Sequence, residues 1–265
     1  MLEKVEQELI NYYAVGRHQP VVDNILAGTS YYRKSSLGLA LSDLSFYYCV
    51  LDNDTSGFAY FNESPLSEEE LIKLINTPIL KAISSTTDIA LRAALIDAAY
   101  SEYKFKPKIR PVKTHTITGG YKKKANFRSK LLTHDLLGKH VVIVGLVSEF
   151  VRDLLANDCR VSVIDLSPEL RGEKILGIPI ISDGNHKTLD LIKSADYAII
   201  SGCTIANDTV DSIIVVAKNN KTHLRFYMET GSNLAPKVKE AGAELVVAET
   251  FPFYDMPGTT TFKVY

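Results

Sequence analysis

The chain has few cysteines, no long hydrophobic run and almost no net charge, and each absence excludes a class of protein. Its three cysteines are odd in number and far apart, which argues against a disulfide framework and favours a reducing compartment. No apolar stretch approaches the roughly 20 residues that span a bilayer. The amino-terminal segment 1–10 is acidic and amphipathic, unlike a signal peptide. Without a signal peptide or a membrane span, we expect a cytoplasmic protein. The net charge of −1 gives no bias toward a membrane or nucleic-acid partner, and we expect neither.

A glycine-rich phosphate loop is also missing. A dinucleotide site needs the pattern Gly-x-Gly-x-x-Gly between a strand and a helix, but the chain has Gly145-Leu-Val-Ser-Glu-Phe150 at that place. The side chains after Gly145 cover the backbone, and Glu149 would repel a pyrophosphate. NAD and NADP are therefore not expected. Asp165, twenty residues after Gly145, suits either a ribose-bearing ligand without a pyrophosphate, such as an S-adenosyl compound, or a simple turn cap.

Metal-binding spacings are equally scarce. The six histidines never pair at the intervals typical of metal ligands. A transition metal remains open as a cofactor, held by residues distant in sequence such as Cys203, His186 and Glu229, but the sequence identifies no ligand set. Cys203 lacks a visible histidine partner, so a buried inert thiol is the simplest interpretation.

What the chain does contain is a regular alternation of short apolar runs and helical patterns after about residue 131. This alternation predicts an α/β fold, a Rossmann-like doubly wound parallel sheet over 131–265. The predicted strands are His140–Val144, Val161–Ile164, Ile178–Ile181, Tyr197–Ile200, Leu224–Met228 and Leu245–Ala248. The predicted helices are Glu149–Ala156, Lys187–Lys193, Thr209–Lys218 and Leu234–Ala241.

The first part of the chain, residues 1–103, has the pattern of a smaller α+β domain. Helical spacing at the start, aromatic and β-prone runs across 29–62, and an alanine-rich segment from Ile89 to Tyr103 predict a helix, an antiparallel meander and a second long helix. Ser67 is the expected N-cap of a short helix between them, and Thr87 or Asp88 that of the long one.

Residues 104–130 form a basic connector in this division. Ten Lys or Arg and no Asp or Glu lie between Tyr103 and His134. Two prolines and the Gly119-Gly120 pair favour a solvated surface linker. An anion-binding arm and a nucleic-acid contact are the alternatives, although no nucleic-acid motif accompanies the charge.

Small and polar residues follow the predicted strands where ligands bind in open parallel sheets. The fourth strand runs directly into small and hydroxyl residues before the next helix. A ligand site is therefore predicted at Gly145, Ser201, Gly202, Cys203, Thr204, Asn207, Thr209, Thr230, Gly231 and Ser232. Glu229 and Asp165 are the candidates for proton transfer, because carboxylates in a closed cleft can have pKa values suited to it.

The stretch from Ala195 to Thr204, with Asn207 and Thr209, resembles the Gly-x-Thr-x-x-Asn-x-Thr motif of a family of unknown-function proteins labelled as heavy-metal-chelation proteins. The runs 141–165 and Glu229 to Ser232 with Pro236 are similar to its neighbouring elements. Residues 38–40 and 90–99 resemble its partner module, which has an enolase-N-terminal-like fold. The resemblance implies two domains with a cleft between them and binding of a metal or a metal chelate. It also implies a link to anaerobic cobalamin metabolism.

Three functions are compatible with these observations. The first is binding of a small polar ligand, a metal or a metal chelate in the interdomain cleft. The second is an enzyme acting on an amino-acid-like or carboxylate metabolite, with natural-product biosynthesis as a setting. The third is an interaction module that uses the basic connector. The sequence leaves open whether the protein is catalytic and whether it forms a homo-oligomer.

Overall fold

The carboxyl-terminal part of the chain builds one large, mostly parallel sheet. The computed structural model describes residues 1–265 except 31–43, 103–108, 183 and 254–255. Within this part the sheet has nine strands, in the order β4-β12-β11-β10-β9-β5-β6-β8-β7. The strands are β4 (Lys113–Thr118), β5 (His140–Val144), β6 (Arg160–Ile164), β7 (Lys174–Ile175), β8 (Ile178–Ile181), β9 (Tyr197–Ser201), β10 (His223–Met228), β11 (Leu245–Thr250) and β12 (Thr259–Val264).

The order of the central strands creates a switch point between β5 and β9. From β5 the chain first adds β6 and β8 on one side, then returns to add β9, β10 and β11 on the other. These neighbours are parallel, whereas β4, β12 and β7 pair antiparallel at the edges. Two connections therefore leave in opposite directions from the carboxyl ends of β5 and β9, where open α/β sheets bind ligands.

Helices cover both faces of the sheet. Successive side chains of each buried strand point to opposite faces, and the side chains on both faces are apolar. Val141 and Ile143 pack with Phe150 of α6 on one face, while Val142 packs with Ile213 of α9 on the other. The helices here are α5 (Tyr121–Thr133), α6 (Ser148–Ala156), α7 (Asn185–Lys193), α8 (Cys203–Ala206), α9 (Val210–Asn220) and α10 (Ala235–Glu240), with single turns at Pro168–Leu170 and Ser232–Leu234.

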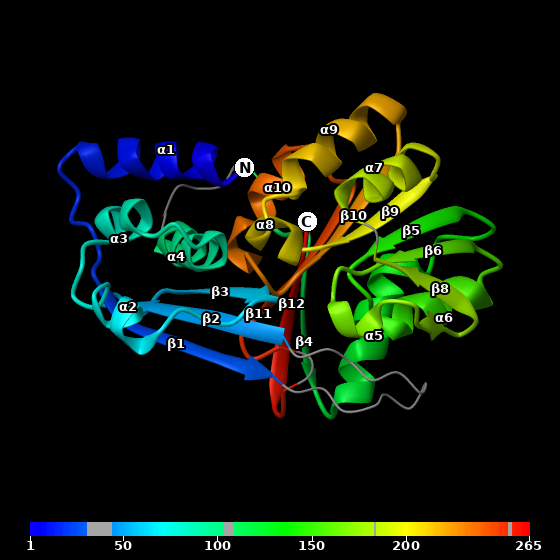
Figure 1. The fold of residues 1–265 in the computed structure, drawn as a ribbon, viewed down its shortest axis with the longest axis horizontal. Helices are drawn as coiled ribbons and strands as arrows, with labels where there is room; N and C mark the ends of the chain where they lie inside the picture. Colours follow the sequence, from blue (N-terminus) through cyan, green and yellow to red (C-terminus); the bar gives the residue numbers. More distant parts are fainter. Residues whose placement is uncertain (31–43, 103–108, 183, 254–255) are drawn as a thin grey trace.

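The amino-terminal part forms a three-stranded antiparallel sheet with helices on one side (Figure 1). Its elements are α1 (Leu2–Ala14), β1 (Val22–Ser30), β2 (Leu44–Leu51), β3 (Ser56–Phe61), α2 (Glu68–Ile72), α3 (Ile79–Ser85) and α4 (Ile89–Glu102). Helix α2 begins with the predicted N-cap Ser67, which forms a capping box with Glu70. For α4, the Asp88 carboxylate accepts a hydrogen bond from the Leu91 N–H at 2.8 Å, as an N-cap does.

Hydrogen bonds join the three-stranded sheet to the large one. The Tyr60 N–H donates to Thr230 Oγ1 at 2.9 Å, and the Gly231 N–H donates to the Phe58 carbonyl at 3.0 Å. The buried Asp97 of α4 accepts from the N–H groups of Phe58 at 3.1 Å and Asn233 at 2.9 Å. The two sheets are therefore fastened where β3 meets the segment after β10.

The predicted fold class is confirmed, including each of the six parallel strands. Strand β1 starts at Val22 rather than in the region 29–62, and the predicted β-prone runs at 31–32 and 37–41 lie outside the described residues. The division at 103 and 131 remains a prediction. Among the described residues, no helix is long and apolar enough to cross a membrane.

Residues 113–130 do not form the solvated linker favoured from their charge. They contain β4 and most of α5, and Lys124 and Arg128 are buried. The Lys124 ammonium donates to the carbonyls of Phe253 and Met256 and to Thr260 Oγ1. Its partners lie more than 120 residues away in sequence, so the local pattern does not identify the groups that receive its charge.

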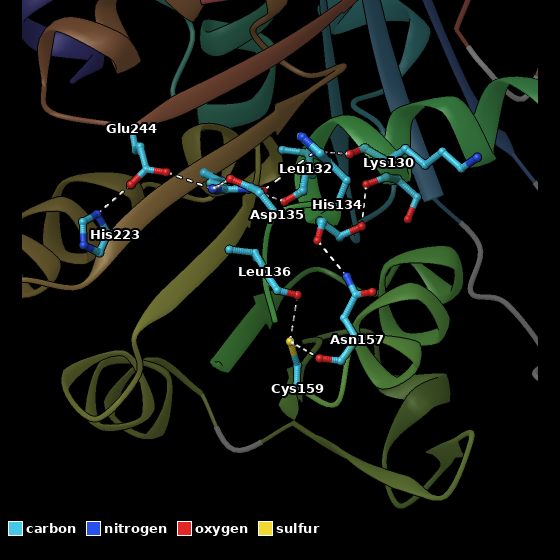
Figure 2. Close-up of polar contacts among 12 residues, drawn as sticks. Lys130, Leu132, His134, Asp135, Leu136, Asn157, Cys159, His223 and Glu244 are labelled. Atoms are coloured by element: carbon cyan, nitrogen blue, oxygen red, sulfur yellow. Dashed lines mark hydrogen bonds and ion pairs between the residues drawn. The ribbon is translucent and has the colours of Figure 1, made fainter. Parts of the chain in front are cut away.

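A cluster of charged side chains lies near the amino ends of the strands. The guanidinium of the buried Arg225 binds both carboxylate oxygens of Asp135, at 2.6 and 2.8 Å, and Glu244 at 2.9 Å. Figure 2 shows this cluster with His223, which contacts Glu244 at 2.6 Å. The Arg225 ion pair holds the pKa of Asp135 below its usual value. The cluster ties the end of α5 to β10.

Candidate functional site

A cavity of about 190 Å³ opens beside the switch point, between the two sheets. The large sheet supplies residues at the ends of β5, β6, β9 and β10, and the three-stranded sheet supplies the rest. The lining consists of Leu44, Tyr60, Asn62, Tyr121, Arg128, Val144, Gly145, Leu146, Val147, Ile164, Asp165, Leu166, Ser167, Leu170, Thr188, Ser201, Cys203, Thr204, Asn207, Thr209, Ile213, Tyr227 and Glu229. Most of these residues are apolar or neutral, which is typical of a small-molecule site.

Gly145 directly follows β5 and has a conformation that only glycine adopts readily. Its φ is +89°, and an added Cβ would lie 2.5 Å from Tyr227 Oη and 2.8 Å from Ser201 Cβ. The Tyr227 hydroxyl donates to the Gly145 carbonyl at 2.9 Å. Burial raises the pKa of Tyr227, so the hydroxyl stays protonated. The close contact joins β10 to the end of β5 across β9 and shapes the cavity floor.

Asp165 follows β6 and is held at the cavity wall by backbone donors. The N–H of Leu146 donates to its Oδ2 at 2.7 Å, and that of Ser167 donates to its Oδ1 at 2.9 Å. Asp165 therefore caps the turn after β6, which is one of the two roles considered for it. Each carboxylate oxygen can still accept a further hydrogen bond, so the same group can also serve a ligand.

The segment Gly202 to Thr209 begins with the short helix α8, and α9 starts at Val210. Ser201, Cys203, Thr204, Asn207 and Thr209, five of the predicted ligand residues, line the cavity.

Several of their polar atoms already have partners within the segment. The Thr204 hydroxyl donates to the Ser201 carbonyl at 2.7 Å. Asn207 Oδ1 accepts from the Thr209 hydroxyl at 2.6 Å and from its N–H at 3.3 Å. These bonds fix the cavity wall in one conformation.

The Cys203 thiol is poorly suited to nucleophilic chemistry. Burial raises its pKa, and its Sγ lies 3.7 Å from Thr230 Oγ1. A raised pKa favours the protonated thiol, which is a weak nucleophile.

Four predicted ligand residues lie outside the cavity lining. Gly202, Thr230, Gly231 and Ser232 are instead at the contact between β9, the end of β10 and the three-stranded sheet. An added Cβ on Gly202 would lie 2.3 Å from the Thr230 carbonyl oxygen. This region positions β3, which in turn supplies Tyr60 and Asn62 to the cavity.

The charged centre of the site is Arg128, which the sequence did not single out. Its side chain is 1% exposed and contacts two carboxylates: Glu229, which faces the cavity, and Glu249, which is fully buried. The distance from Nη1 to Glu249 Oε1 is 2.9 Å. Its guanidinium carbon also lies 5.4 Å from the Tyr227 ring centre, a cation–π distance. Two acids thus share one guanidinium at the cavity wall.

Arg128 and Tyr121 could have been found from helical spacing. They lie two turns apart on one face of α5, with Lys124 between them. This periodicity was obscured by the exposed lysines beside them and by the glycine pair before them. Tyr227 and Glu249 carry no comparable local signal, because strand alternation alone does not reveal which buried polar groups meet.

A bare metal ion does not fit the described residues. No group of three or more His, Cys, Asp or Glu side chains there could hold one. Within the cavity, Glu229 is paired with Arg128, and Cys203 Sγ lies 3.7 Å from Thr230 Oγ1. His186, in the set Cys203, His186 and Glu229, is exposed and not part of the lining.

The fold is that of a Rossmann-like α/β protein, and its cavity lies at the switch point of the sheet. In sequence, residues 129–224 match the DUF364 family, whose description is "Putative heavy-metal chelation". The predicted resemblance is thereby confirmed for that part of the chain. No curated protein matches the chain in sequence.

Two similar crystal structures carry the same family label. One is a protein of unknown function from Desulfitobacterium hafniense, with a TM-score of 0.59, 16% identity, and coverage of 99% of this chain and 98% of that one. The other, from Pyrococcus horikoshii, has a TM-score of 0.54, 14% identity, and coverage of 100% and 99%. At these identities the likeness shows the fold, and it extends over both sheets.

Proposed function

We propose that the protein binds a small polar ligand carrying hydrogen-bond donors or a positive charge in the cavity between the two sheets. The supporting observation is the charge balance of the described cavity wall. Asp165, Glu229 and the underlying Glu249 are acidic, and Arg128 is the basic side chain among them. An excess of carboxylates in a largely apolar, partly closed site favours donors and cations and disfavours anions.

Analysis of what co-purifies tests this proposal. Untagged protein is denatured, and the released small molecules are identified by mass spectrometry. We expect a cationic or donor-rich compound in near-stoichiometric amount, or one that raises the melting temperature when added back. Recovery of an anionic metabolite instead would contradict the proposal.

A charge variant locates the binding. Glu229→Gln keeps the side-chain size but removes the charge that faces the cavity. We expect at least a tenfold loss of affinity for a cationic ligand, while the exposed Glu173→Gln serves as the matched control and leaves affinity unchanged. Equal affinity in both variants would place the ligand elsewhere.

A preformed metal chelate is a second candidate, favoured by the description of the family matched by residues 129–224. The ligand would then bring its own donor atoms, consistent with a cavity that lacks a cluster of metal-binding side chains among its described residues. Metal analysis of untagged protein, with and without prior dialysis against a strong chelator, tests this candidate. Metal that leaves together with an organic molecule supports it, whereas metal that leaves alone contradicts it.

A further inference from the structure

We propose that the ligand is a nucleoside: a flat base on a ribose with a free vicinal diol and no phosphate group. This inference rests on the proposed function and names the chemical class for the same cavity. Three features support it, namely a fixed carboxylate at the end of β6, an exposed apolar residue directly after it, and charges in the described cavity lining that disfavour a phosphate.

The carboxylate of Asp165 is arranged to accept two neighbouring hydroxyls. Its two oxygens are held by the Leu146 N–H at 2.7 Å and the Ser167 N–H at 2.9 Å. Because both donors are backbone groups, the carboxylate cannot rotate away without losing them. Each oxygen retains capacity for one more donor, and the two lie side by side on the cavity wall. A vicinal diol presents two donors with this spacing, as the ribose does to an acid at this position in dinucleotide folds.

The next residue provides an apolar surface beside that carboxylate. Leu166 is 40% exposed and lines the cavity, together with the buried Leu170 and with Leu146. An exposed leucine at a cavity mouth is stabilised when a flat apolar group covers it. A base attached to a ribose held by Asp165 would lie close to these side chains. The polar edge of the base can then reach the surrounding hydroxyl residues.

The charges of the described cavity lining disfavour a phosphate. Helix α6, which follows Gly145, carries Glu149 in its first turn, and the Ser148 hydroxyl donates to that carboxylate at 3.2 Å. The side chains of Leu146 and Val147 line the cavity. Arg128 is engaged by two carboxylates. The charged side chains of the described lining are Asp165, Glu229 and Arg128, so a negative group on the ribose 5′ carbon would face more acids than bases.

Calorimetric titration with three related probes tests the inference: adenosine, 2′,3′-dideoxyadenosine and adenosine 5′-monophosphate. Guanosine, cytidine and uridine are titrated in parallel to establish the base preference. For the preferred base, we expect the ribonucleoside to bind at least tenfold more tightly than its dideoxy counterpart, because the diol is lost. We also expect at least a tenfold loss when the 5′ phosphate is added.

Two variants tie the binding to the proposed contacts. Leu166→Ser should weaken nucleoside binding about fivefold or more. Leu176→Ser replaces a leucine of similar exposure, 42%, outside the cavity lining and should leave it unchanged. Asp165→Asn should remove the preference for the diol. Circular dichroism checks its folding, and Leu166→Ser keeps the test decisive if Asp165→Asn unfolds.

The outcomes separate this inference from the broader proposal. Equal binding of the ribonucleoside and dideoxynucleoside, or tight binding of the monophosphate, overturns the nucleoside assignment. If no nucleoside binds but a donor-rich or cationic compound of another class does, with sensitivity to Glu229→Gln, the nucleoside assignment fails and the proposed function stands. If no small molecule binds and Glu229→Gln changes nothing, both are wrong.

Discussion

Single residues at the strand ends carry more than one role. Asp165 caps the turns after β5 and β6 and also lines the cavity. Its position twenty residues after Gly145 was visible in the sequence, but that spacing did not distinguish a turn cap from a ligand group. The structure shows that the two roles are compatible, because capping uses one lone pair of each carboxylate oxygen.

Gly145→Ala is predicted to destabilise the protein and to impair ligand binding. A side chain at φ +89° costs about 1–2 kcal/mol from the backbone alone. The contact at 2.5 Å with Tyr227 Oη adds a steric cost and displaces the cavity floor. Urea unfolding and titration with the co-purified ligand measure the two effects.

Gly177→Ala is the matched control for that experiment. Gly177 has a similar φ of +84°, but no atom lies within 4 Å of an added Cβ. It should show the backbone cost alone and unchanged ligand affinity. Equal losses of stability in the two variants would contradict the role given to the Gly145–Tyr227 contact.

At the scale of elements, helix α5 illustrates how local pattern and tertiary environment can disagree. Its sequence, Tyr121-Lys-Lys-Lys-Ala-Asn-Phe-Arg128, has the composition of a solvated face. Yet Lys124 and Arg128 point inward, where carbonyls and carboxylates from the end of the chain receive them. Charged residues can be buried when they are paired, and the partners were too distant in sequence to be recognised.

Arg128→Leu is predicted to lower the free energy of unfolding by roughly 3–5 kcal/mol, because it leaves two carboxylates without their guanidinium. Adding Glu249→Gln should recover part of that loss, since the fully buried acid is then neutral. Urea unfolding of the two single variants and the double variant measures the coupling. Additive losses would show that the Arg128–Glu249 contact is not energetically important.

Asp135→Asn tests the other ionic cluster, at the opposite edge of the sheet. Asp135 accepts two bonds from Arg225, but its side chain is 50% exposed, so we expect a loss of only about 0.5–1 kcal/mol at pH 7. Arg225 lowers the Asp135 pKa in the folded state, and the stability it contributes is therefore present above the ordinary pKa and lost as the pH falls. Ligand affinity should not change, and a change would contradict the separation of the two clusters.

At the scale of the whole molecule, the cavity depends on how the three-stranded sheet docks on the large one. Tyr60 and Asn62 reach the cavity from β3 and its end, and β3 is fastened through Asp97, Thr230 and Asn233. These contacts explain why the predicted residues Thr230 to Ser232 lie near the site without lining it. They hold in place the element that completes it.

Asp97 makes this docking sensitive to pH. Burial raises the pKa of its carboxyl group from 3.8 to about 7, although the N–H groups of Phe58 and Asn233 act in the opposite direction. The folded state therefore binds this proton more tightly than the unfolded state. The resulting stability is fully present below the unfolded pKa and is lost as the pH rises through about 7.

The measurement is urea unfolding between pH 5 and pH 8. The wild-type protein should lose on the order of 1 kcal/mol per pH unit across the lower part of this range, and Asp97→Asn should flatten that slope. Asp190→Asn is the control, because Asp190 is exposed and its pKa is lowered by Lys193. An unchanged slope in Asp97→Asn would assign the pH dependence to other groups.

The sequence by itself determined the α/β class, the six parallel strands and the gathering of small and polar residues at the strand ends. These follow from periodicity and from turn and cap residues, which act over a few neighbours. Only the tertiary structure decided that α5 completes the cavity, that Arg128 joins two distant acids, and that Gly202 and Thr230 to Ser232 serve docking. Those outcomes depend on contacts between residues that are far apart in sequence, and no local pattern records such contacts.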